Sequence, residues 1–175
     1  MAIDRGPWNA LIDDDGSNLV GSIWNKAAIK TVLLDPIDAS LALTPPPTLQ
    51  TYQPEFRAGG GSALPIGTGT LTGFYQQTGK VTWVHIHLTF GSTTPGPTGA
   101  WSFSLPFVLA DGVTAFAGLA FNGSAQWQLV TSSIGYAQEV QVFAPGNPMT
   151  AVTNTVPFTW SPGCHLAING TYRAA

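Results

Sequence analysis

The sequence predicts a mainly β domain that is preceded by a short helical segment. Eight short segments rich in Val, Ile, Thr and aromatic residues follow one another after residue 69, and Gly, Pro, Asn, Asp or Ser separates most of them. No comparable helical period appears after residue 48. Segments of this length and spacing are typical of a sandwich, a jelly roll or a barrel.

Charge divides this chain of 175 residues into unequal parts. Nine of its fifteen charged residues lie within residues 1–39, and they account for the whole formal charge of −3. The composition changes at residues 44–48, Thr-Pro-Pro-Pro-Thr, where consecutive prolines favour an extended and semi-rigid spacer. We therefore predict an N-terminal segment over 1–43, a Pro-rich linker over 44–48 and a β domain over 49–175.

One helix is expected in the N-terminal segment. Ser22 is a favoured N-cap, and the Asp-Pro pair at 35–36 ends the pattern because the residue before proline avoids helical conformation. The spacing places Trp24, Ala28 and Val32 in one row along the helix. An isolated helix of about three turns is marginal in water. We therefore expect this row to dock on the β domain or on a partner.

The eight predicted strands differ in how clearly their two faces can be assigned. They are expected over residues 70–77, 80–90, 101–110, 113–121, 125–131, 138–143, 156–160 and 165–172. In the second of them Val84, Ile86 and Leu88 alternate with the row Trp83, His85, His87 and Thr89. The first set is predicted to be core. The second set is predicted to be a wet face or an interface between subunits.

The composition excludes several classes of protein. Only 9% of the residues are charged, against about 25% in typical soluble domains, which suggests burial against other subunits. The six basic residues are scattered in an acidic chain, which argues against binding to nucleic acid. No apolar run is long enough to insert in a membrane, and the N-terminus lacks the pattern of a signal peptide, so we expect synthesis in a cytoplasm. The single cysteine, Cys164, excludes a disulfide framework within one chain.

Two groups of residues are candidate metal ligands. His85 and His87 share one side of a strand, but two ligands are too few for a tight site unless a three-fold oligomer supplies six. The alternative is that they are two polar residues on a half-exposed face, and His165 is too distant in sequence to be placed beside them. Residues 13–18, Asp-Asp-Asp-Gly-Ser-Asn, resemble the start of a calcium loop, but the spacing is shorter and the terminal Glu is missing. An acidic turn before the helix is the favoured explanation, so no cofactor is predicted beyond a possible metal at a trimer axis.

No catalytic site is predicted. Glycoside hydrolysis needs two carboxylates that flank one bond, yet Glu55, Asp111 and Glu139 lie in or beside different predicted segments. The chain also lacks a Gly-x-Ser-x-Gly nucleophile motif.

Aromatic side chains offer flat faces on which sugar rings stack. The candidates are Trp83, Trp101, Trp127 and Tyr136, although Trp and Tyr are also ordinary core residues of β domains.

Several stretches of the chain resemble a module found near the C-termini of tailed-bacteriophage virion proteins. They are the strand and turn sequences at 69–75, 79–81, 88–94 and 99–106, together with 156–160 and 170–172 near the end of the chain. The N-terminal residues Trp8-Asn9, 13–17 and 23–26 resemble an attachment or stem segment of such proteins. The resemblance contains no catalytic signature.

The resemblance implies a place and an architecture. It implies a jelly-roll-like antiparallel β-sandwich that follows a short N-terminal helical anchor segment and assembles as a homotrimer in the virion. The N-terminal part, with Trp8, Trp24, Ala28 and Val32, would contact phage capsid or tail proteins or the other subunits. The chain lacks a long repetitive shaft, which shifts the expectation toward a head fibre, a capsid decoration or a short tail fibre whose outward domain binds host-surface glycans. The alternatives are a carbohydrate-binding module or lectin without a particle, and a small polysaccharide depolymerase.

Overall fold

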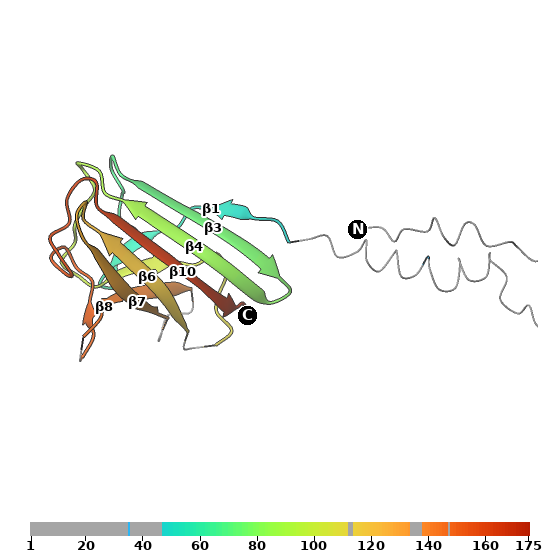
Figure 1. Cartoon of the computed structure of the whole chain (residues 1–175). Coiled ribbons are helices and arrows are strands. Elements are labelled where there is room, and N and C mark those ends of the chain that lie inside the picture. Colours follow the sequence, from blue (N-terminus) through green and yellow to red (C-terminus); the bar gives the residue numbers. More distant parts are fainter. Residues whose placement is uncertain (1–34, 36–46, 112–113, 134–137, 147) are drawn as a thin grey trace, which may run out of the picture. The chain divides into compact units, whose positions relative to one another are not determined.

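The β domain is a single curled antiparallel sheet. The computed structural model describes residues 35, 47–111, 114–133, 138–146 and 148–175. The chain divides into two units, Met1–Pro46 and Pro47–Ala175, of which the second carries the described fold (Figure 1). The predicted helix over 22–34 lies outside the described residues, as does most of the predicted linker.

Ten strands are present in the described part of the chain. They are β1 (Gln50–Tyr52), β2 (Phe56–Ala58), β3 (Thr70–Thr78), β4 (Val81–Thr89), β5 (Trp101–Ser104), β6 (Ala115–Phe121), β7 (Gln126–Ser132), β8 (Glu139–Ala144), β9 (Thr150–Ala151) and β10 (His165–Arg173). Their order in the sheet is β1-β3-β4-β10-β6-β7-β8-β5-β2, and β9 pairs with β8. The C-terminal strand β10 therefore lies between β4 and β6, which can be followed in Figure 1.

The sheet curls because its two end strands are neighbours in the chain. Only residues 53–55 join β1 to β2, so the two edges of the sheet must come together. Ser104 at the end of β5 connects them: its backbone nitrogen donates to the carbonyl of Glu55 at 3.0 Å, and its own carbonyl accepts from the Tyr52 hydroxyl at 3.2 Å. We call this meeting of the two sheet edges the seam.

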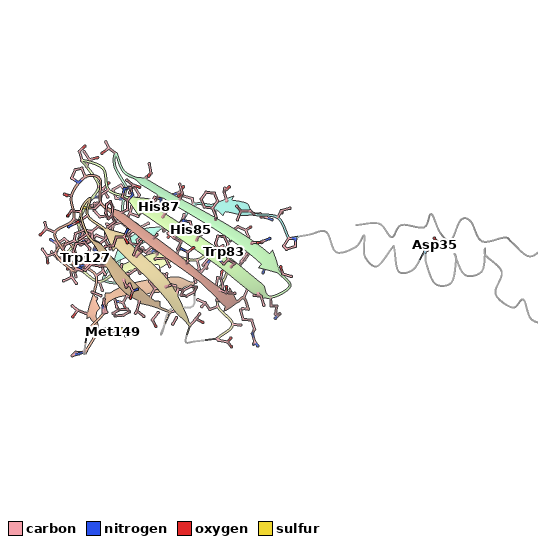
Figure 2. All side chains as sticks on the ribbon, in the orientation of Figure 1. Asp35, Trp83, His85, His87, Trp127 and Met149 are labelled. Atoms are coloured by element: carbon pink, nitrogen blue, oxygen red, sulfur yellow. The ribbon has the colours of Figure 1, made fainter. Side chains whose placement is uncertain are left out.

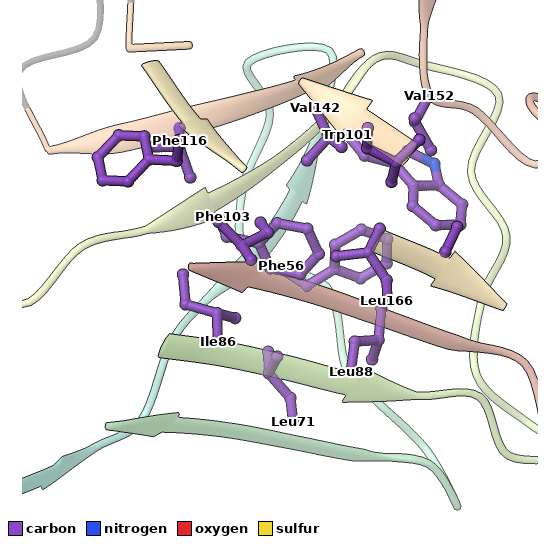
Figure 3. Close-up of a cluster of buried hydrophobic side chains, with 14 of the residues drawn as sticks. Phe56, Leu71, Ile86, Leu88, Trp101, Phe103, Phe116, Val142, Val152 and Leu166 are labelled. Carbon is purple, nitrogen blue, oxygen red and sulfur yellow. The ribbon is translucent and has the colours of Figure 1, made fainter. Parts of the chain in front are cut away.

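The core fills the inside of the curl. Val84, Ile86 and Leu88 of β4 are each 0% exposed, as the alternation in the sequence predicted. They face an aromatic group from the other half of the sheet, in which Phe56 stacks on Phe103 at 5.3 Å between ring centroids (Figure 3). Burial of large apolar side chains is the main stabilising contribution to such a domain.

The prediction of a mainly β, antiparallel domain is confirmed, whereas a two-sheet jelly roll is not. The described strands form one hydrogen-bonded sheet that faces itself across the core. The short strands β1, β2 and β9 escaped prediction because two or three residues do not establish a period.

Two predicted strand assignments are wrong in detail. Residues 157–160 are irregular, and Val156 makes one isolated bridge, to Thr153. The aromatic side chains there serve as core instead, since Trp160 packs 4.8 Å from Trp101 between ring centroids. The strand predicted over 101–110 ends at Ser104, shortly before Pro106, which cannot donate to a sheet ladder.

Candidate functional site

Five flat rings form a continuous row on the outer face of the sheet. The row consists of Trp83, His85 and His87 on β4, His165 on β10 and Phe121 on β6, and we call it the ring row. Successive ring centroids are 6.3, 6.3, 5.4 and 6.1 Å apart. Figure 2 labels the three members on β4, which lie along one strand. The row is possible because β10 pairs with both β4 and β6, which brings His165 beside His87.

The imidazoles of the ring row are held by polar neighbours. Nδ1 of His85 lies 2.8 Å from Oδ1 of Asn169, and Nδ1 of His165 lies 3.1 Å from the hydroxyl of Thr89. Burial lowers the pKa of His87, and the neighbouring His165 and His85 lower it further. His87 therefore favours its neutral form.

The three histidines of the ring row contact one another ring to ring. Among the described residues, no group of three or more His, Cys, Asp or Glu side chains is arranged to hold a metal ion. The rings of His87 and His165 stack nearly parallel, with an interplanar angle of 6°. This stacking explains the close approach of His87 and His165 without an ion.

The predicted aromatic candidates divide between surface and interior. Trp83 is 37% exposed on the outer face, whereas Trp101 is 0% exposed. Trp101 packs against Phe56, so its indole offers no surface to a ligand and it leaves the set of candidates. Trp127 is half-buried with its ring centroid 4.4 Å from that of Phe158.

Five predicted residues lie outside the described residues. They are Tyr136 and the predicted anchor residues Trp8, Trp24, Ala28 and Val32.

A pocket of about 520 Å³ opens at the seam. It is lined by residues 51–53, 55 and 57, by Tyr75 of β3, by residues 104–107 at and after the end of β5, and by residues 138 and 139 where β8 begins. We call it the seam pocket. Its volume falls within the range of ~300–1,000 Å³ that is usual for small-molecule sites.

An ion cluster forms one side of the seam pocket. The guanidinium of Arg57 binds the carboxylates of both Glu55 and Glu139. Glu139 also accepts a hydrogen bond from the hydroxyl of Ser102 at 3.1 Å. The hydrogen bond to Glu55 raises the pKa of Arg57, and the charge of Glu139 raises it further. The cluster therefore carries one positive and two negative charges.

Aromatic side chains form the other side of the seam pocket. Tyr75 packs edge-on against Tyr52 at 6.0 Å and against Phe107 at 5.2 Å, measured between ring centroids. Gly73 makes room for the Tyr52 ring, since a β-carbon there would lie 2.4 Å from it. Desolvation by burial raises the pKa of Tyr52, so its phenol stays protonated and donates to Ser104.

Reasoning from the sequence separated residues that the fold brings together. Glu55 and Glu139 were placed in different segments, and both belong to one cluster because β2 and β8 pair with opposite edges of β5. The alternation Glu55-x-Arg57, which places both side chains on one face of an extended segment, was a local signal for half of this cluster.

Comparison with known proteins yields a partial match. No family model matches the chain. The chain is similar to a protein of Haemophilus influenzae named "Mu-like prophage FluMu defective tail fiber protein", with 31% identity over 113 residues. The aligned region covers 62% of this chain and 18% of that relative. The chain is thus similar to a phage tail fibre protein over a part of that protein's length.

Within the ranges that the structure describes, no helix combines the length and the apolar character that crossing a bilayer requires.

Proposed function

We propose that this chain is a structural, non-enzymatic component of a tailed-phage particle, of the short tail fibre kind. The observation that carries the proposal is the 31% identity to a prophage tail fibre protein. The module resemblance in the sequence points in the same direction, and the mainly β domain is consistent with both.

The proposed arrangement has an attached N-terminal segment and an outward β domain. Residues 1–43, with most of the charge, bind the particle, and residues 44–48 act as a spacer. Three chains associate as a homotrimer, which would cover the sparsely charged surface of the β domain. The outer face offers a suitable surface, because Val81, Trp83 and Leu119 are large exposed apolar residues on it.

Binding to a host-surface glycan is the proposed task of the β domain, and catalysis is not assigned to it. The carboxylates of Glu55 and Glu139 are adjacent, but Arg57 engages both. Because both carboxylates are held in ion pairs with this guanidinium, neither is assigned the role of a general acid or base.

The experiment that tests the proposal is crosslinking of intact particles, followed by mass spectrometry of peptides from residues 1–40. Crosslinks from this segment to tail proteins are the expected result. Crosslinks to capsid subunits would instead make the chain a head fibre or capsid decoration. Absence of the chain from purified particles would contradict the proposal and favour a lectin that acts without a particle.

The trimer is tested separately by light scattering of the purified full chain at micromolar concentration. We expect a mass three times that of one chain. A monomer in solution and in the particle would contradict the trimer.

A further inference from the structure

We propose that the seam pocket binds one hydroxyl-rich sugar ring that carries no acidic group. The inference rests on the proposed function, because it names the site and the ligand class through which the β domain would bind a host-surface glycan.

The walls of the seam pocket match the two kinds of surface that a sugar presents. Tyr52, Tyr75 and Phe107 supply an aromatic side on which the C–H face of a sugar ring can pack. Glu55 and Glu139 also line the pocket and supply carboxylate oxygens, each with more acceptor positions than the bonds to Arg57 use. A ligand with one apolar face and several hydroxyl donors fits this pair of walls.

The charge of the ion cluster selects against acidic sugars. Arg57 is the one basic residue that lines the described pocket, and two carboxylates already bind it. An anionic group would have to displace one of these carboxylates and would meet a cluster with an excess negative charge. The pocket therefore favours a sugar without an acidic group.

The pocket is held in shape before any ligand arrives. Nε2 of Gln138 donates to the carbonyl of Leu105 at 3.1 Å, and Nε2 of Gln53 donates to the carbonyl of Leu71 at 3.1 Å. The Tyr75 hydroxyl donates to Oε1 of Gln50 at 2.6 Å. Side chains fixed in this way lose little conformational entropy on binding, which favours recognition of a small ligand.

The probes are methyl glycosides of glucose, galactose, mannose, rhamnose and N-acetylglucosamine, with methyl glucuronide as the acidic probe. Binding to the purified full chain is measured by saturation-transfer NMR and by competition. We expect saturation transfer to at least one neutral glycoside and a weaker effect for methyl glucuronide. No transfer to any neutral glycoside, or stronger transfer to methyl glucuronide, would overturn the proposal.

Two seam variants and one matched control locate the site. Tyr75→Ala removes the central ring of the aromatic side, and we expect affinity for the neutral glycoside to fall about three- to tenfold. Glu55→Gln frees Arg57 from one partner, so we expect the preference for the neutral glycoside over methyl glucuronide to narrow. Trp83→Ala alters the ring row, and it should change neither the affinity for the neutral glycoside nor the preference over methyl glucuronide.

The variants remain informative if one of them fails to fold. Glu55 has a side chain that is 48% exposed, so Glu55→Gln is expected to fold and tests the charge argument alone. Loss of binding in Trp83→Ala, with binding retained in the seam variants, would place the ligand on the ring row and overturn the proposal.

These outcomes are separate from those of the proposed function. The NMR experiment uses the purified chain and needs no particle. A chain that is absent from particles but binds a neutral glycoside at the seam would contradict the virion role and support the pocket. A chain that is crosslinked to tail proteins but binds none of the neutral glycosides would support the virion role and contradict the pocket.

Discussion

The ring row and the seam pocket are two uncommon surfaces on one domain, and they are built in opposite ways. The ring row lies on the outer face of long, regularly paired strands, and its members are aromatic and imidazole side chains. The seam pocket lies where two strands of three residues meet, and it holds three of the six charged residues that follow residue 39. A flat face suits contact with a wide surface such as another subunit, whereas a concave site with fixed polar groups suits a small ligand.

If the ring row is a surface layer over a separate core, one tryptophan from each should contribute differently to stability. Trp101→Ala should lower the free energy of unfolding by ~3–5 kcal/mol, because it empties a buried site beside Phe56. Trp83→Ala should lower it by about 1 kcal/mol or less, because its ring is partly exposed. Urea unfolding of both variants measures the difference. Equal losses would mean that Trp83 belongs to the core.

The shape of the seam depends on the absence of a side chain at Gly73. Gly73→Ala should destabilise the domain by ~1–3 kcal/mol, because the new methyl group would overlap the ring of Tyr52. Thr72→Ala, which alters the exposed neighbour on the same strand, should stay within about 0.5 kcal/mol of the wild type. Thermal unfolding compares the two. A neutral Gly73→Ala would show that β1 moves without cost and that the pocket is not held in shape.

The two carboxylates of the seam should contribute unequally to stability. The Glu139 side chain is 14% exposed and holds both Arg57 and Ser102, so Glu139→Gln should cost about 1–2 kcal/mol. The Glu55 side chain is 48% exposed, so Glu55→Gln should cost about 0–1 kcal/mol and depend on salt. Denaturant unfolding at low and high salt separates the two. A larger cost for Glu55→Gln would contradict the assigned geometry.

The smallest expected effect is a loss of stability at acidic pH that arises from His87 in the ring row. The folded pKa of His87 lies below its ordinary value of 6.5, so the unfolded chain binds a proton more readily than the folded one. Stability should therefore be full above about pH 6.5 and should fall as the pH drops below it.

Melting temperatures between pH 7 and pH 5 measure this fall. His87→Gln should make the fall in melting temperature smaller. Glu139→Gln alters the seam instead and should show the same fall as the wild type. An unchanged fall in His87→Gln would assign the acid response to other groups.

The difference between the two regions also decides what the sequence can predict. The alternation of Trp83, His85 and His87 with buried aliphatic residues identified the outer face of β4, because side chains alternate with a period of two along any strand. The place of His165 beside His87 depends on the pairing of β10 with β4, which joins residues far apart in the chain. No local pattern encodes such a pairing.

The seam pocket could not be predicted either, because it depends on several pairings between strands that are distant in the sequence. Its ion cluster takes Glu55 and Arg57 from one end of the sheet and Glu139 from a strand two positions away in the sheet order. Only three residues separate β1 from β2, which brings the two edges of the sheet together. This constraint can be used only when both segments are recognised as strands. Trp101 was predicted as a ligand-binding candidate but is buried. The sequence does not separate these two roles, because the chemistry of an indole is the same in a core and in a binding site.

The most direct test of the account is an amide chemical-shift map of the β domain within the full chain during titration with the neutral methyl glycoside that shows the strongest saturation transfer. We expect the largest shifts at residues 51–57, 104–107 and 138–139, around the seam pocket. Shifts concentrated at residues 81–89 and 165–169, along the ring row, would contradict the assignment of ligand binding to the seam.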